Sequence, residues 1–519
     1  MAEGASGEAE VNRWVVLVAV MLGTFLSILD TTIMTVAFPH IMTAFGSDVE
    51  GTRWVTTAFM ISAAVSMPTS SWLGRRLGYG PTYLAALMLF TAGAAFSASA
   101  WSLDSLIISR IVQGLAAGVI QPTSIAILTR TFPPEIRGRV FGIWSIGVMV
   151  APTLGPTVGG FVIEWFNWRG IFTMSLIAGL PAILMAAAVL SREREEAQPF
   201  DWKGYLALAT FLVVGLLTIS FGENEGWTSQ IILLGGAITL VSMLLFLALE
   251  WDEPYPIVPL RLFRLPDFTL AMFLTVYRSL GLFGSVFLLP IFLQQIQGWG
   301  SASIGLMMMP GAVVMTLCSP IAGILTDRFG GRWPTIIGVV LISYSQYLYR
   351  DLDAASGVWA ILWPQLPRGF GMAMIMTPVI TTGMNAVPQD DAGHASWMLN
   401  LSQRGGGAFA ISMLSSLLQR ETTLQTFRLG GSPLINTPPS AEIVREGMRA
   451  GFSAAEASSV ATAIFGRQIR RAAGALAFQK LYLLTGLVTV TAVIPAFFLS
   501  TSAERAAVAA RAAANTARA

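Results

Sequence analysis

The chain has 519 residues, of which 54% are hydrophobic and only 12% are charged, and its formal net charge is +2. Soluble domains carry about 25% charged residues, so this composition excludes a soluble globular protein and indicates the lipid bilayer as a partner. The small net charge gives no support to nucleic acid as a partner. The single cysteine, Cys318, excludes an intrachain disulfide and a multi-cysteine metal site.

The first apolar run starts at Trp14 and contains a carboxylate, Asp30. The polar stretch before it, Met1 to Asn12, lacks the basic region and cleavage site of a signal peptide, so a retained span is predicted. A carboxylate inside a span is costly in lipid and normally faces a bundle interior, a water-filled path or a cation. Asp30 is therefore a proton-site or substrate-site candidate, unless it is a structural residue bonded to neighbouring hydroxyls such as Thr31 and Thr32.

Apolar stretches of about 17–25 residues, each long enough to cross a bilayer, recur along the whole chain. We predict about fourteen spans and no strands: 14–38, 54–74, 82–101, 105–128, 140–163, 170–190, 204–221, 230–250, 268–293, 302–325, 334–350, 358–380, 395–418 and 480–500. With the N-terminus inside, the short inner segments hold most of the arginines. The short outer loops hold only Arg53, Arg169 and Arg350, which predicts that both termini are cytoplasmic.

Two loops repeat at a constant offset. Gly74-Arg75-Arg76-Leu77-Gly78 follows the second span, and Thr326-Asp327-Arg328-Phe329-Gly330 follows the tenth. The fourth and twelfth spans contain Arg110-Ile111-Val112-Gln113-Gly114 and Gln365-Leu366-Pro367-Arg368-Gly369, in which the cation and the amide exchange places. Two related halves around a midplane site are how many secondary transporters are built.

With these motifs the chain resembles the major facilitator superfamily, and within it the fourteen-span drug:H⁺ antiporters of the EmrB type. Leu29 to Ile33 with Ala37-Phe38-Pro39 is similar to the family's first-span motif, and Arg110 to Gly114 to its fourth-span motif. The fifth span looks like the antiporter motif. Its residues of interest are Gly147, Ala151, Pro152, Gly155, Pro156, Gly159 and Gly160.

The resemblance implies an all-α fold of two pseudo-symmetric six-helix bundles, 1–200 and 256–519, joined by two inserted helices in 201–255. It implies a proton-driven exporter of hydrophobic or amphipathic compounds in the bacterial cytoplasmic membrane, with no cofactor. In two-membrane bacteria it also implies a periplasmic adaptor and an outer-membrane channel. The loop motif departs from the family in the first half, because Arg75 stands where the family has an acid. Only the second half has the acid, Asp327. The residues expected to form the gate loops are Arg75, Arg76, Asp327, Arg328 and Arg332.

The elements also carry physical expectations. Gly147, Ala151, Gly155 and Gly159 form a small-residue stripe that lets another helix approach closely, and the two prolines predict a bend. Arg110 needs neutralisation, so we hypothesise that Asp30 binds the coupling proton while Arg110 lowers its proton affinity in one state. The residues expected to line a substrate path are Met34, Phe38, Gln113, Gln121, Arg278, Gln294, Gln365, Arg368, Asn400 and Arg404.

The long outer segment 419–479 is predicted to turn helical after a Gly/Pro-rich stretch, with Ser453 and Glu456 as a capping box. This helix lies at the membrane surface or docks an outer partner such as the adaptor. His394, beside Asp391, is expected to be a gate or surface residue rather than a proton carrier. No HExxH or GxxxxGK[ST] pattern occurs, which speaks against an enzyme. An exporter of an endogenous anion, such as a fatty acid, bile salt or siderophore, is the alternative that the buried arginines suit.

Overall fold

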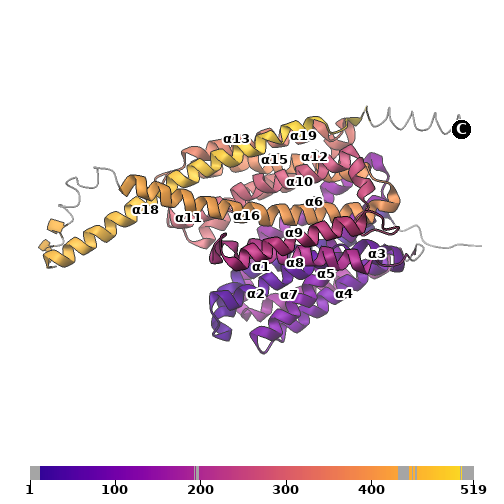
Figure 1. Cartoon of the computed structure of the whole chain (residues 1–519), viewed down its shortest axis with the longest axis horizontal. Coiled ribbons are helices and arrows are strands. Elements are labelled where there is room, and N and C mark those ends of the chain that lie inside the picture. The colour runs from indigo at the N-terminus through magenta and orange to yellow at the C-terminus, as the bar shows by residue number, and fades with distance from the viewer. Residues whose placement is uncertain are drawn as a thin grey trace, which may run out of the picture.

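The computed structural model describes residues 12–191, 193–194, 198–430, 444–446, 448–450, 453–502 and 504. These residues form helices, apart from loops and one isolated bridge between Gly330 and Thr501. Figure 1 shows two bundles side by side, the N-terminal one in indigo to purple and the C-terminal one in pink to yellow. The all-α architecture predicted from the sequence is confirmed.

The N-terminal bundle contains all the helices expected there. Short polar caps define several helix starts: Asn12 accepts from the backbone of Trp14, and Ser102 and Ser105 form a capping box at the start of the fourth span. The helices are α1 (Arg13–Phe45), α2 (Val49–Ser66), α3 (Thr69–Leu77), α4 (Tyr79–Ala98), α5 (Leu103–Thr131), η1 (Pro134–Ile136), α6 (Arg137–Phe166) and α7 (Arg169–Val189).

The two inserted helices are α8 (Trp202–Glu225) and α9 (Gln230–Glu250), which pack on each other. They bond to both bundles. Arg53 of α2 donates to the carbonyl of Ser220 at 2.8 Å, and Trp227 donates to the hydroxyl of Ser416 in the C-terminal bundle at 3.0 Å. The inserted pair therefore lies beside both bundles and contacts each of them.

The C-terminal bundle repeats the pattern with more breaks. Proline or glycine begins or interrupts several of its helices, as at Pro266, Gly300 and Pro364. Its helices are η2 (Leu260–Arg264), α10 (Pro266–Val286), α11 (Leu288–Gln295), α12 (Ser301–Phe329), α13 (Arg332–Leu348), η3 (Tyr349–Asp351), α14 (Val358–Leu362), α15 (Gln365–Asn385), η4 (Gln389–Asp391), α16 (Ala392–Gly430), α18 (Ala454–Thr491) and α19 (Val493–Phe497).

Each of the fourteen predicted spans coincides with one helix or with two consecutive helices. Within the described residues, nine helices are long and apolar enough to cross a bilayer, or ten if the two parts of α6 count as one span. Exposed apolar side chains such as Ile231 and Leu244 of α9 fit contact with lipid. The number fourteen stays a prediction.

Helices α16 and α18 are much longer than the spans predicted for them, with 39 and 38 residues. Their extensions form an arm that projects at the left of Figure 1, at the opposite end of the molecule from α3. A 2.7 Å ion pair between Lys480 and Glu421 joins the two helices. The predicted capping box is confirmed, because Ser453 and Glu456 bond reciprocally at the start of α18. The Gly/Pro-rich residues 431–440 lie outside the described part of the chain, as do Met1 to Val11.

Candidate functional site: a buried ion pair and a closed inner gate

Asp30 of α1 and Arg110 of α5 form an ion pair in the interior of the N-terminal bundle. The Arg110 Nη1 donates to Asp30 Oδ2 at 2.5 Å, and both side chains are fully buried. The first and fourth spans thus bring the only pair of opposite intramembrane charges predicted in this bundle into direct contact. A buried pair is costly to break, because it leaves an uncompensated charge in a medium of low polarity.

Polar neighbours complete the surroundings of the carboxylate. Ser175 of α7 donates to Asp30 Oδ1 at 3.2 Å, and Gln113 lies at 3.5 Å from the same oxygen. Arg110 Nη1 also donates to Gln113 Oε1 at 2.8 Å. Arg110, Ser175 and Gln113 thus all place hydrogen-bond donors at the carboxylate.

The threonines beside Asp30 do not hold it. The Thr31 hydroxyl donates to the carbonyl of Ser27, and the Thr32 hydroxyl donates to carbonyls of Ile28 and Leu29. Such bonds to the preceding turn are the usual use of hydroxyls in membrane helices. The alternative of an Asp tied up by its neighbouring hydroxyls therefore has no support in these contacts.

Arg110 is held on its other side by aromatic rings rather than by acceptors. Its guanidinium carbon lies 4.2 Å from the centre of the Phe59 ring and 5.8 Å from that of Phe172. Among the described residues, its Nε and Nη2 have no hydrogen-bond partner. Arg110 thus contacts a carboxylate through one nitrogen only, Nη1. Its contacts with the aromatic rings are favourable, but weaker than a second bond to a carboxylate would be.

The small-residue stripe of α6 packs on α1 beside this site. A Cβ atom at Gly155 would lie 2.9 Å from the Cβ of Thr32, and one at Gly159 would lie 2.9 Å from Ile33 Cγ2. The predicted bend is confirmed: the segments Pro134–Pro152 and Leu154–Phe166 meet at 41°. Gly160 differs from the stripe, because no atom lies within 4 Å of a Cβ built there.

Asp327 closes one side of the end that the charge distribution assigns to the cytoplasm. Its two carboxylate oxygens accept the backbone N–H groups of Gly138 and Arg139, at 2.7 and 2.8 Å. These groups belong to the first turn of α6, where a negative charge is favoured by the helix dipole. Gly138 and Gly323 let α6 and α12 approach backbone to backbone, so the C-terminal bundle caps a helix of the N-terminal one.

Arg75 closes the other side with the opposite charge. Its Nη2 donates to Nε2 of His394 at 2.9 Å, and His394 Nδ1 lies 3.6 Å from Asp391 Oδ1. Asp391 also pairs with Arg261 of η2 at 2.9 Å. The resemblance places an acid at position 75, where this chain has an arginine. Here the acid at this contact is Asp391 of the C-terminal bundle, just before α16. His394 is buried at this contact rather than at the surface, and its role in a gate stays a prediction.

Two further bonds cross between the bundles at the same end. Arg137 donates to Asn385 Oδ1 at 3.0 Å, and Arg130 donates to the carbonyl of Gln389 at 3.3 Å. The other gate-loop residues stay within their own half: Arg76 stacks on Trp72, Arg328 on Phe329, and Arg332 pairs with Glu504. Several hydrogen bonds therefore join the two bundles at this end of the structure.

The residues predicted to line a substrate path fall into separate groups. Gln113 belongs to the Asp30 site, and Gln121 approaches Arg404 across the two bundles at 3.5 Å. Asn400 is buried and donates to the carbonyl of Ser396, whereas Gln294 is exposed. Met34 is buried and Phe38 is half-buried.

Three arginines of the C-terminal bundle have no carboxylate partner among the described residues: Arg278 and Arg368, which are buried, and Arg404, which is half-buried. Gln365 and Arg368 both face Gly311 of α12, where a Cβ would lie 2.7 Å from each of their side chains. Uncompensated cations at such positions are costly unless an anion or water meets them.

Some site residues carry no distinctive signal in the sequence. Ser175 is one small hydroxyl in an apolar span, and Phe59 is one of 30 phenylalanines. The cross-bundle bonds of Arg130 and Arg137 are also invisible in the sequence, where both arginines count only as inner positive charges.

The family model of the Major Facilitator Superfamily matches residues 20–411. The chain is 32% identical to the uncharacterized MFS-type transporter YhcA of Bacillus subtilis, over 82% of this chain and 80% of that protein. It is 30% identical to the multidrug resistance protein B homolog of Mycobacterium tuberculosis (92% and 88%) and 29% to the multidrug export protein EmrB of Escherichia coli (78% and 80%).

Solved structures of low sequence identity share the fold. The proton:xylose symporter XylE superposes with a TM-score of 0.60 at 15% identity, over 94% of this chain and 96% of that one. The human organic anion transporter MFSD10 gives 0.56 at 15% identity, over 92% and 99%.

Proposed function

This chain belongs to the major facilitator superfamily, and we propose that it exports hydrophobic or amphipathic compounds in exchange for protons. Family membership makes it a membrane transporter and not an enzyme, and its relatives include multidrug efflux proteins. The observation that carries the proposal is the buried contact between Asp30 and Arg110. We take the bacterial cytoplasmic membrane as its location and the proton gradient as its energy source.

Asp30 is the proton carrier in this proposal. Protonation removes its charge, so Arg110 loses its attraction to the carboxylate and its buried charge must find water or another acceptor. Deprotonation restores the pair seen here. The two protonation states of one residue thus favour two positions of Arg110, which is what coupling to a proton gradient requires.

In this proposal the packing contact between α1 and α6, called the seam below, couples the protonation of Asp30 to the inner gate. Thr32, two residues after Asp30, packs on Gly155 of α6, and the first turn of α6 is capped by Asp327 of the other bundle. A shift of α1 therefore displaces a helix whose N-terminal end belongs to the gate. Rocking of the two bundles around a midplane site then exposes the substrate path alternately to the two sides.

The test is transport in proteoliposomes driven by an imposed pH gradient, with a panel of lipophilic cations and anions. Accumulation against a gradient that disappears with a protonophore supports proton exchange. Accumulation that ignores the pH gradient but follows another ion contradicts it. Wild-type protein is compared with D30N in the same liposomes.

A second candidate is export of an endogenous anionic amphiphile. Arg278, Arg368 and Arg404 favour it, because no described carboxylate neutralises them. The two candidates separate in the same assay: preferred uptake of labelled anions such as fatty acids or bile salts supports the second, and preferred uptake of lipophilic cations supports drug export.

The arm of α16 and α18 is the surface on which we propose that an outer adaptor docks, in hosts that have a second membrane. Its support is its projection beyond the bundles (Figure 1). Capture of such an adaptor that is unchanged after deletion of residues 428–460 contradicts this docking mode.

A further inference from the structure

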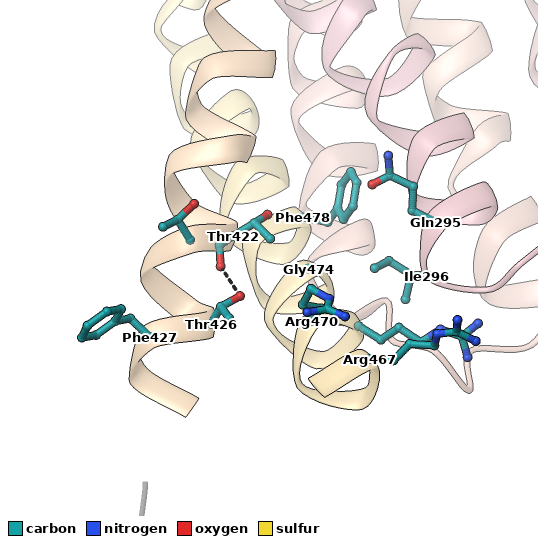
Figure 2. Close-up of a pocket in the computed structure, with 11 residues that line it drawn as sticks. Gln295, Ile296, Thr422, Thr426, Phe427, Arg467, Arg470, Gly474 and Phe478 are labelled. Carbon is teal, nitrogen blue, oxygen red and sulfur yellow. Dashed lines mark hydrogen bonds between the residues drawn. The ribbon is translucent and has the colours of Figure 1, made fainter. Parts of the chain in front are cut away.

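A cavity of about 1020 Å³ opens between the arm and the C-terminal bundle. Figure 2 shows it between the extensions of α16 and α18, with Gln295 and Ile296 at the end of α11 on the other side. The charged wall is provided by Arg467, Arg470 and Arg471 of α18, and the apolar end by Ile296 and Phe478.

The charged wall has no partner within the described part of the protein. The three arginines are exposed, and no described carboxylate pairs with them. Arg467 and Arg471 are four residues apart on one helix, so the two like charges face the same side and repel each other. The nearby acid Glu421 is engaged with Lys480. An anion in the cavity would relieve this repulsion.

The apolar end is well ordered by packing. Phe478 is 1% exposed and stacks edge-on with Phe292 at 5.5 Å between ring centres. Gly474 lets α18 approach Ile296, since a Cβ there would lie 2.7 Å from Ile296 Cδ1. Seven residues separate Arg471 from Phe478, which is about 10 Å along the helix. The cavity therefore offers positive charge at one end and apolar surface about 10 Å deeper.

The cavity belongs to one bundle only. All its lining residues come from α16, α18 and the end of α11 with its cap residue Ile296, in the C-terminal half. Cargo that moves by rocking of two bundles passes between them, so a site inside one half is badly placed for cargo. Both α16 and α18 continue into predicted membrane spans, which places the cavity where helices leave the bilayer.

We propose that this cavity binds an anionic phospholipid from the adjacent leaflet, with the phosphate at Arg467, Arg470 and Arg471 and an acyl chain toward Phe478. Arginine binds phosphate oxygens in pairs of hydrogen bonds, and basic pockets at the membrane surface recognise lipid headgroups in this way. The bound lipid holds the base of the arm against α11.

The experiment counts lipids bound to the purified full-length protein by native mass spectrometry, with phosphatidylglycerol and phosphatidylcholine as probes. The variant R467Q/R470Q/R471Q removes the charged wall, and R420Q/R428Q/R449Q removes three arginines of the same outer segment that do not line the cavity. A third variant, R467K/R470K/R471K, keeps the charge. Size-exclusion profiles check that all variants fold.

We expect the wild type to retain phosphatidylglycerol in preference to phosphatidylcholine. The first variant should bind it roughly a hundredfold more weakly, since each of the three basic residues near the surface contributes about a factor of five. The control should bind like the wild type, and the lysine variant should recover most of the binding.

Three results overturn the proposal. One is equal phosphatidylglycerol binding by the wild type and the first variant. Another is competition by inorganic phosphate as effective as that of the lipid, which would mean that the acyl chain is not recognised. The third is unchanged lipid binding together with reduced export of amphipathic anions, or with loss of a bound partner protein, because the cavity would then serve cargo or a partner. None of these readouts requires the protein to be a proton antiporter.

Discussion

Arg75 and His394 meet at the end of the protein that the charge distribution assigns to the cytoplasm, 319 residues apart in sequence, with the guanidinium donating to the imidazole Nε2 at 2.9 Å. On the other side of the gate the carboxylate of Asp327 caps α6. The two halves thus close the same end with opposite charges at equivalent loop positions. The start of α16 tolerates Arg75 because Asp391 supplies the negative charge that a helix N-terminus favours.

Replacing Arg75 by Gln should open the inner end. The substitution removes a charge-assisted hydrogen bond of about 1–2 kcal/mol between the halves, or roughly a tenfold change in the population of the closed state. Arg76→Gln is the matched control, since Arg76 stacks on Trp72 of its own half. Spin labels attached at L77C and F263C, in a C318S background, report the distance across the gate by double electron–electron resonance. Equal distance distributions for R75Q and R76Q would show that the contact does not hold the gate.

Closure of the inner end should depend on pH through His394, which precedes the expected span 395–418. Burial lowers the pKa of His394, and Arg75 and Arg261 act in the same direction, while Asp391 opposes them. The pKa of Asp391 is lowered too, because His394 and Arg261 outweigh its burial, so it stays charged. Tyr79 of α4 also lies at this contact, and Glu250, Glu253 and Tyr255 line the same cavity as Arg75 and His394.

The sign of the effect follows from the lowered pKa. The closed end prefers neutral His394, whereas the open, hydrated end binds a proton at the ordinary pKa of about 6.5. Closure is therefore fully favoured above about pH 6.5 and weakens as the pH falls below it. The same labelled pair, measured from pH 8 to pH 5, should show opening on acidification. His394→Gln keeps an acceptor for Arg75 without titrating, and it should flatten this dependence; an unchanged pH profile in H394Q would assign the effect to another group.

Asp30→Asn should abolish accumulation against a gradient while the protein still folds. Asn keeps the shape of Asp but leaves Arg110 without its counter-charge, at a cost of about 3–5 kcal/mol. Exchange of substrate across the membrane without a pH gradient should persist, because it needs no proton transfer. Asp104→Asn, at an exposed position in the first turn of α5, is the control and should transport normally. Full uphill transport by D30N in proteoliposomes would exclude Asp30 as the proton carrier.

The pairing of Asp30 with Arg110 could be predicted because two opposite charges in neighbouring spans have few ways to avoid each other in lipid. The contact between Arg75 and His394 could not, because it depends on how α3 meets α16 and no pattern links the two loops. The helices were located well, but the ends of α16 and α18 were not. Hydropathy places the ends of the spans near 418 and 480, whereas backbone hydrogen bonds continue each helix into polar sequence to Gly430 and from Ala454.

Gly155→Ala tests whether the seam between α1 and α6 matters for both stability and transport. A Cβ at this position would lie 2.9 Å from Thr32 Cβ and 3.3 Å from the backbone nitrogen of Ile33, so α1 must shift away. Overpacking of this kind costs about 1–3 kcal/mol. Gly160→Ala, five residues further on, is the control because its Cβ meets no atom within 4 Å, and loss of a helix glycine there should stabilise by about 0.5–1 kcal/mol. Thermal unfolding in detergent should therefore order the variants G155A, wild type, G160A from least to most stable, and export should fall only in G155A. If G155A unfolds and exports like the wild type, the seam does not transmit the state of Asp30 to the gate.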